Sequence, residues 1–114
     1  MRIAVACSGL PIAARYELAQ DLTCYNINRG IIVGCQNMPF PKMSTNDLAK
    51  TLKSLGVEVL IVGAIKKDAE NQLRNAGVEV VSGFEGFPAD AVSAYVTEKL
   101  WGTDDIPKKI HPQP

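Results

Sequence analysis

Apolar and polar residues divide the first third of the chain into three strand-like runs. The first, Arg2 to Cys7 (RIAVAC), is mostly apolar and partly β-branched, which predicts a strand in the centre of a sheet. A second run spans Leu22 to Ile27 (LTCYNI), and a third spans Ile31 to Gln36 (IIVGCQ). Asn28-Arg29-Gly30 separates these two runs, and its glycine accepts a positive φ, so we expect a hairpin.

The rest of the chain alternates between helical and strand-like patterns. Pro39 and Pro41 interrupt the chain after the hairpin, and Gly56 and Gly77 each stop a helix before a β-branched run. In order, the pattern predicts a helix with Leu48, Leu52 and Leu55 on one face, a strand from Val57 to Val62, a helix with Ala69, Leu73 and Ala76, a strand from Val78 to Val81, and a helix with Ala89, Val92, Val96 and Leu100.

The order of these elements, β-ββ-α-β-α-β-α, is typical of an α/β protein with a mixed five-stranded sheet. Each strand-helix-strand unit should join parallel strands through a right-handed crossover. We expect one α/β domain over residues 1–101, because 114 residues favour a single core. Residues 102–114 show no period, which predicts a loose C-terminal tail.

Composition narrows the class of protein. Apolar residues make up 46% of the chain and charged residues 21%, as in soluble globular proteins. Twelve basic residues balance twelve acidic ones, so we expect no nucleic-acid partner. The first apolar run is too short for a signal peptide or a membrane span, which favours a cytoplasmic protein with no membrane partner. The three cysteines form no CxxC motif and are expected to be free thiols.

The chain lacks the residues that several classes of enzyme require. No GxGxxG or Walker motif follows either apolar strand, which disfavours nucleotide binding. The first strand carries no carboxylate for a two-metal phosphoryl site. The sole histidine, His111, lies between isoleucine and proline in the tail, so a Cys–His hydrolase and a Cys/His zinc site are both disfavoured. We therefore expect a protein that is not an enzyme, and close packing of Glu17 and Asp21 in a crevice would reopen that question.

The segments "MRIAVACSG…ARYELAQDLTCYNI" and "LAKTLKSLGVEVLIVGAIKKDAENQLRNAGVEVVSGFEGFPADAVSAYVTEKL" resemble the dinitrogenase iron–molybdenum cofactor biosynthesis family. The resemblance covers residues 1–100. It implies a ribonuclease-H-like fold and a small carrier of nitrogenase cofactor or its precursor. Members carry a His-Phe-Gly or Arg-Phe-Gly signature before the second strand, which corresponds here to Arg15-Tyr16-Glu17. Lys66 and Lys67 occupy a region where members often have a glycine.

The loop that follows the first strand is the leading candidate for a binding site. In open α/β sheets, such strand ends often line ligand crevices. We predict that Ser8, Gly9, Arg15 and Tyr16 hold an anionic or iron–sulfur-type ligand, with Arg15 supplying charge and directed hydrogen bonds. The alternative is that Arg15 is solvated and that Tyr16 packs as a lid on the core.

Cys7 and Cys35 are the candidate metal ligands, since thiolates bind iron and iron–sulfur species. A two-residue hairpin loop would place Cys24 directly opposite Cys35, whereas a three-residue loop would place Thr23 there. Cys7 ends its strand at the loop, which favours exposure. The alternative is that all three cysteines are small core residues.

Two functions remain open. The first is a small non-enzymatic binding protein that carries an iron–sulfur or iron–molybdenum cluster, as the resemblance implies. The second is an interaction or regulatory module that has lost the cofactor and docks a protein partner through an exposed sheet edge or the segment "NMPFPKM" (residues 37–43). The glycines of "SGFEGFPADAV" (residues 82–92) either bind an anion at a helix start or simply turn the chain. The sequence leaves the oligomeric state open.

Overall fold

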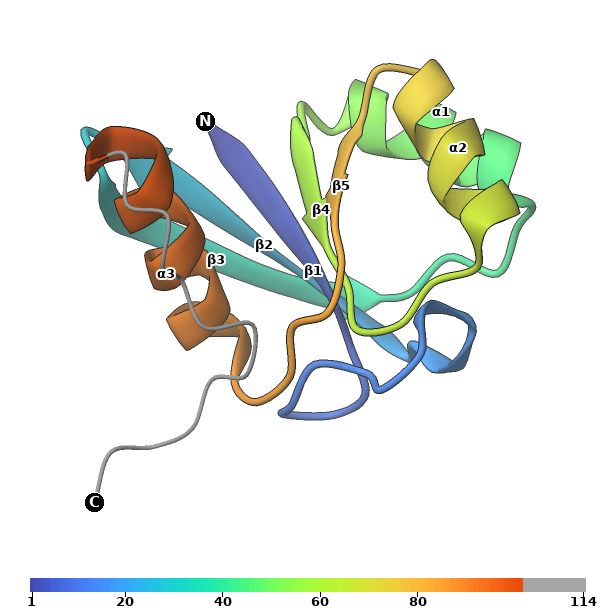
Figure 1. Cartoon of the computed structure of the whole chain (residues 1–114), viewed down its shortest axis with the longest axis horizontal. Coiled ribbons are helices and arrows are strands. Elements are labelled where there is room, and N and C mark those ends of the chain that lie inside the picture. The colour runs from blue at the N-terminus through green and yellow to red at the C-terminus, as the bar shows by residue number, and fades with distance from the viewer. Residues whose placement is uncertain (102–114) are drawn as a thin grey trace.

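The computed structural model describes residues 1–101 (Figure 1). The predicted tail over residues 102–114 lies outside them. The elements are β1 (Arg2–Cys7), a 3₁₀ turn η1 (Tyr16–Leu18), β2 (Asp21–Asn28), β3 (Ile31–Pro39), α1 (Thr45–Ser54), β4 (Val59–Ile61), α2 (Lys67–Asn75), β5 (Glu79–Val81) and α3 (Pro88–Trp101).

The five strands form one mixed sheet in the order β3-β2-β1-β4-β5. β1 pairs antiparallel with β2 and parallel with β4, and β4 pairs parallel with β5. This arrangement confirms the predicted fold class. Figure 1 shows α1 and α2 on one side of the sheet and α3 on the other. The sheet therefore buries both of its faces, as the apolar pattern of β1 and β4 requires.

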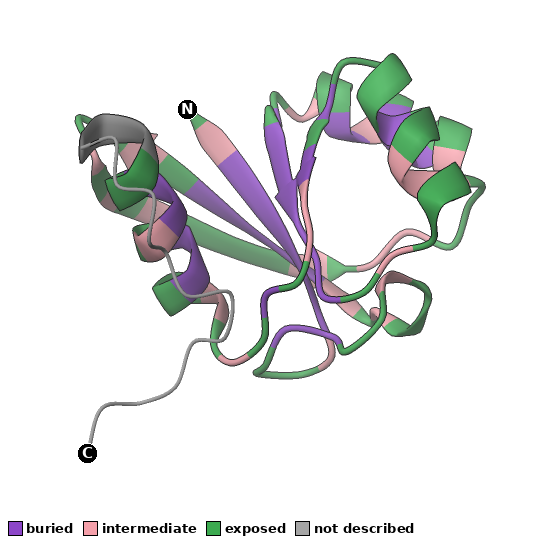
Figure 2. Cartoon of the chain, viewed as in Figure 1, coloured by how far each residue is buried: buried purple, intermediate pink, exposed green. Residues whose placement is uncertain are grey.

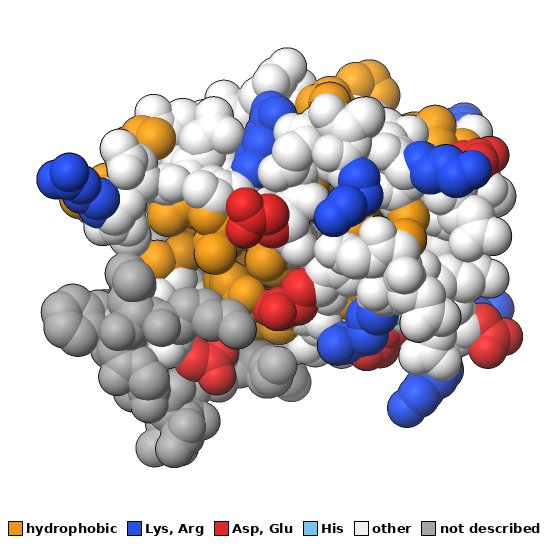
Figure 3. All heavy atoms as spheres, turned by 90° about the horizontal axis from the view of Figure 1, so that it is seen from above, with side chains coloured by type: hydrophobic (Ala, Val, Ile, Leu, Met, Phe, Trp, Pro, Cys, Tyr) orange, Lys and Arg blue, Asp and Glu red, His pale blue; other side chains and the backbone are white. Residues whose placement is uncertain are grey.

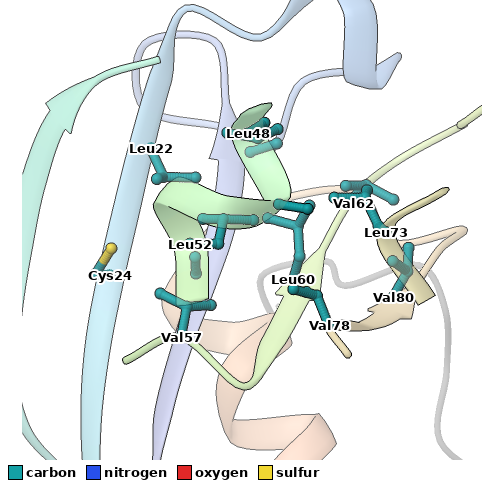
Figure 4. Close-up of a cluster of buried hydrophobic side chains, with 13 residues drawn as sticks. Leu22, Cys24, Leu48, Leu52, Val57, Leu60, Val62, Leu73, Val78 and Val80 are labelled. Atoms are coloured by element: carbon teal, nitrogen blue, oxygen red, sulfur yellow. The ribbon is translucent and has the colours of Figure 1, made fainter. Parts of the chain in front are cut away.

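Each face of the sheet has its own hydrophobic cluster, and Figure 2 shows the buried residues concentrated along the central strands. Side chains alternate between the faces of a strand, so neighbours along β1 enter different clusters. The cluster under α1 and α2 is drawn in Figure 4 and includes Leu22, Leu48, Leu52, Leu60 and Leu73. The cluster under α3 includes Ile3, Val5, Cys7, Tyr25, Ile61 and Val92.

The β2–β3 hairpin differs from both predicted registers. Its turn has two residues, Arg29 with φ 53° and Gly30 with φ 80°. A register shift follows between Asn26 and Ile27, because Val33 is an extra residue on β3. Beyond this bulge, Cys35 lies opposite Tyr25, and neither Cys24 nor Thr23 faces it as predicted.

β3 is an edge strand and continues through Pro39, beyond its predicted end at Gln36. The N–H of Phe40 donates to the carbonyl of Gln20 at 2.9 Å, so even-numbered residues of this part of β3 bond to β2. The backbone of Pro39 consequently faces away from the sheet. A proline is tolerated there because its missing N–H leaves no ladder bond unmade.

Candidate functional site

The loop between β1 and β2, residues 8–20, crosses the carboxyl ends of β1 and β4. The N–H of Ala64 donates to the carbonyl of Ala14 at 2.8 Å, and the N–H of Tyr16 donates to the carbonyl of Ala64 at 2.7 Å. Arg15 and Ala64 form a parallel bridge between these bonds. Backbone contacts therefore fix the position of the candidate signature residues relative to β4.

Gly63 allows this close approach. A Cβ built on Gly63 would lie 2.4 Å from the carbonyl oxygen of Ala13 and 2.6 Å from that of Ala14. No side chain fits between two backbones at that separation. The sequence prediction assigned no role to Gly63, because this packing role depends on a backbone contact between distant segments.

Arg15 lines a shallow hollow of about 250 Å³ together with Glu17, Ala64, Ile65 and Lys66. Lys66 is the N-cap residue of α2, and its side chain makes no capping hydrogen bond. Within residues 1–98, the ion pair found is Arg74–Glu70, and neither Arg15 nor Lys66 takes part in one. The hollow thus combines two exposed, unpaired cations with one carboxylate, that of Glu17.

Tyr16 lines a second and larger hollow, of about 620 Å³. Its ring meets that of Phe40 edge-on, with centroids 5.8 Å apart and planes at 80°. Both rings pack against the cluster under α1 and α2. Partial burial raises the pKa of the Tyr16 hydroxyl, while a hydrogen bond with Thr45 acts in the opposite direction. Tyr16 therefore packs over the core, and it also lines this hollow together with Lys42.

Ser8 and Gly9 belong to a separate turn. The N–H of Ser8 donates to the carbonyl of Pro11 at 2.9 Å, and the N–H of Gly9 donates to the carboxylate of Asp21, also at 2.9 Å. Neither residue lines the hollow of Arg15 or that of Tyr16. The four predicted binding residues do not converge on one hollow, and their role stays a prediction.

The candidate thiol ligands lie away from both hollows. Cys7 is fully buried on the α3 side of the sheet, so the expectation of an exposed Cys7 is wrong. It is buried because Ile12 pairs with it and folds the loop back over the strand end. Cys24 is buried on the other side, and Cys35 is exposed on β3. Within the part of the chain that the structure describes, no cluster of three His, Cys, Asp or Glu side chains could hold a metal ion.

Burial also controls the ionisation of Cys7. Desolvation raises the pKa of its thiol, and the hydroxyl of Thr23, 3.8 Å from the sulfur, partly offsets this effect. Asn37 holds that hydroxyl by donating its amide N–H to Thr23 Oγ1 at 2.9 Å. Cys7 therefore stays protonated in the folded chain at neutral pH and is a poor candidate for a metal-binding thiolate.

This raised pKa makes stability depend on alkaline pH. An unfolded thiol loses its proton near pH 8.5, whereas folded Cys7 retains its proton to higher pH. The stabilisation is fully present below the unfolded pKa and is lost as pH rises toward the folded pKa. Urea midpoints at pH 7, 8, 9 and 10 under reducing conditions should therefore fall more steeply for the parent than for Cys7→Ala. An unchanged slope in Cys7→Ala would contradict the assignment.

The glycine-rich segment at residues 82–87 turns the chain after β5. The N–H of Gly83 donates to the carbonyl of Gly63 at 2.8 Å, and that of Phe84 donates to the carbonyl of Val62 at 3.3 Å. The N–H groups of Gly83 and Phe84 are therefore already used within the turn that follows β5, and anion binding at the start of α3 stays a prediction. Gly86 adds to the same network, because its carbonyl accepts from the N–H of Ile12.

Among the residues that the structure describes, the end of the molecule at which β1 begins carries no single-sign patch of charge. Figure 3 shows acidic and basic side chains interspersed there, with hydrophobic side chains between them.

Across residues 1–101, the structure contains no helix of the length and apolarity that a membrane crossing needs.

Comparison with known proteins identifies one family. The sequence pattern of the family described as "Dinitrogenase iron-molybdenum cofactor" matches residues 1–98. None of the functionally curated proteins compared with the chain matches it significantly.

Solved structures share the fold. PH0822 superposes with a TM-score of 0.75 at 18% identity, covering 84% of this chain and 88% of its own. MJ0327 from Methanocaldococcus jannaschii, provisionally named a dinitrogenase, gives 0.70 at 14% identity, covering 87% and 90%. TM1290 from Thermotoga, provisionally named a NifB protein, gives 0.61 at 22% identity, covering 82% and 85%. At these identities the likeness establishes the fold alone.

Proposed function

Because the chain belongs to the dinitrogenase iron–molybdenum cofactor family, we propose that it is a small non-enzymatic protein that carries that cofactor or an iron–sulfur precursor of it. Membership of this family is the basis for proposing an iron–molybdenum cofactor or its precursor as the ligand. The names of MJ0327 and TM1290 point to the same field of chemistry. A non-enzymatic role is supported by Glu17 and Asp21, because Glu17 lines the two hollows and Asp21 lines neither.

The cationic hollow is the observation that carries the proposal. Metallosulfur clusters of this class are anionic, and Arg15 and Lys66 offer positive charge without a carboxylate in ion-pair contact. The guanidinium of Arg15 can donate in a fixed fork to sulfur or carboxylate oxygen on the cargo. The backbone hydrogen bond between Ala14 and Ala64, here called the Ala14–Ala64 clasp, holds Arg15 beside Lys66 before any ligand arrives. This preorganisation lowers the entropy lost on binding.

The residues fit a preformed cluster and do not fit a cluster ligated by thiolates of this chain. Cys7 is buried with a raised pKa, and Cys35 lies on β3, outside both hollows. The cargo would therefore keep its own sulfides, and the protein would hold it through charge and hydrogen bonds. Such binding is expected to be reversible and sensitive to salt, since the two cations are exposed.

Anaerobic gel filtration with isolated iron–molybdenum cofactor tests the proposal. The protein fraction should retain molybdenum and iron, measured by mass spectrometry of the elements. Arg15→Ala and Lys66→Ala should each weaken retention about tenfold or more, as expected for the loss of a charged hydrogen bond. Lys50→Ala on the exposed face of α1 is the matched control and should retain the metals. Cys35→Ser should also bind like the parent.

Glu17 supports the second candidate, a module that no longer binds the cofactor and instead contacts a protein. Its carboxylate lines both hollows and would repel an anionic cluster. If the parent retains no metal but Glu17→Gln does, the parent has lost the carrier function through this residue. If neither protein retains metal, the carrier proposal is wrong.

A further inference from the structure

The outer edge of β3 is unpaired by any other strand in residues 1–101, because β3 ends the strand order of the sheet. Even-numbered residues near its middle bond to β2, as the Phe40–Gln20 bond fixes. Cys35 and Asn37 consequently direct their backbone N–H and C=O groups away from the sheet. These groups form a template onto which another extended strand can add.

The usual protection of an edge strand is missing from the middle of β3. Residues 31–39 contain no Lys, Arg, Asp or Glu, although edge strands commonly carry such charges against pairing. Ile31 and Val33 leave β-branched side chains 65% and 61% exposed. The two protective devices present are the bulge at Val33 and the missing N–H of Pro39. These two devices lie on either side of residues 34–38 and leave the outward backbone groups of that stretch unprotected.

We propose that β3 pairs antiparallel with β3 of a second copy of this chain, so that two sheets join into one. A two-fold interface requires a surface that complements itself. An uncharged strand meets this requirement, since no like charges face one another across the pair. The zero formal net charge of the chain adds no long-range repulsion. The inference is independent of the proposed cofactor, because no residue of β3 from Ile31 to Met38 lines the hollow of Arg15 or that of Tyr16.

The positions of the outward groups select the register. Pairing centred on Gln36 places Cys35 of each copy opposite Asn37 of the other, so both residues exchange N–H and C=O groups in full. A centre at Asn37 would bring Cys35 against Pro39, which has no N–H to donate. A centre at Cys35 would bring Asn37 against the bulged Val33. The structure thus favours Gln36 as the centre.

This register makes Cys35 a reporter of the interface. The two Cys35 residues become diagonal neighbours on one face, about 7–8 Å apart, with a somewhat shorter distance between their Cβ atoms. That separation is too long for a direct disulfide and suits a short bismaleimide. Cys35 is exposed in the monomer, while Cys7 and Cys24 are buried, so the reagent has one accessible target per chain.

The interface is expected to be weak. A nine-residue strand is about 30 Å long, and edge pairing of this length covers less area than a stable dimer needs. Light scattering after gel filtration should therefore show monomer at micromolar and dimer at millimolar concentration. The short bismaleimide should yield a covalent dimer of the parent, and Cys35→Ser should yield none.

Two variants test the pairing itself. Asn37→Lys places a charge within residues 34–38 and should weaken dimerisation about tenfold. Asn37→Ala loses the same bond to Thr23 without adding charge and should dimerise like the parent, so it controls for that bond. Cys35→Pro removes an outward N–H and should also weaken dimerisation, with circular dichroism confirming that the sheet is intact. A parent that stays monomeric at millimolar concentration, or a dimer unaffected by Asn37→Lys and Cys35→Pro, would overturn the proposal.

Discussion

Leu60→Ala is expected to lower the free energy of unfolding by about 2–5 kcal/mol. Leu60 is fully buried at the middle of β4, and Figure 4 shows it inside the cluster with Leu52 and Val78. The substitution removes apolar contacts and leaves a cavity that the sheet and α1 cannot close. Domains of this size are stable by about 5–15 kcal/mol, so the variant should lose a large part of its stability.

Urea unfolding followed by circular dichroism measures this loss, with the denaturant slope used to confirm two-state behaviour. Leu10→Ala is the matched control, because it removes the same atoms from a side chain that is 79% exposed. It should change stability by less than about 0.5 kcal/mol. Equal effects of the two variants would show that Leu60 is not in a packed core.

Gly63→Ala is expected to destabilise the chain by about 1–3 kcal/mol and to displace the loop that carries Arg15. The new Cβ would lie 2.4 Å from a backbone oxygen of Ala13, which cannot rotate away as a side chain can. Relief requires the loop to move off β4 and break the bonds between Ala14, Ala64 and Tyr16. The cationic hollow should therefore open along with the loss of stability.

Amide hydrogen exchange at Ala64 and Tyr16 distinguishes this local effect from general loss of stability. Both N–H groups should exchange faster in Gly63→Ala than in a variant of equal stability such as a milder core truncation. Gly34→Ala is the control, since its Cβ would meet only side-chain atoms of Asn26, with Nδ2 nearest at 3.2 Å. Unchanged protection of Ala64 and Tyr16 in Gly63→Ala would refute the packing role of Gly63.

The sequence predicted the fold well because hydrophobic period and helix stops are local signals. β1 was predicted with its observed bounds, and the order of the elements was correct. The hairpin register was wrong because one extra residue, Val33, shifts the pairing, and a bulge leaves no mark in apolar periodicity. Pro39 was interpreted as a break because its tolerance depends on β3 being an edge strand, which is a property of the sheet.

The site was harder to predict because its geometry depends on backbone contacts between distant segments. Arg15 and Lys66 meet through the Ala14–Ala64 clasp, 50 residues apart in sequence. The exposure of Cys7 was predicted wrongly for the same kind of reason, since the returning loop at Ile12 covers it. The glycine at position 63 is a local signal of close backbone approach, and the sequence prediction assigned it no role.

The pairing of β1 with β4 has a consequence for the order of folding. Ile3 and Val59 are register partners, so this pairing closes a loop of more than fifty residues, whereas the β2–β3 hairpin closes over two. Loop-closure entropy places the long-range step late. The clasp at Ala64 needs that step to be complete, so Arg15 and Lys66 meet only in a nearly finished chain. A partly folded chain, including one still emerging from the ribosome, would expose its hairpin before the hollow of Arg15 and Lys66 has formed.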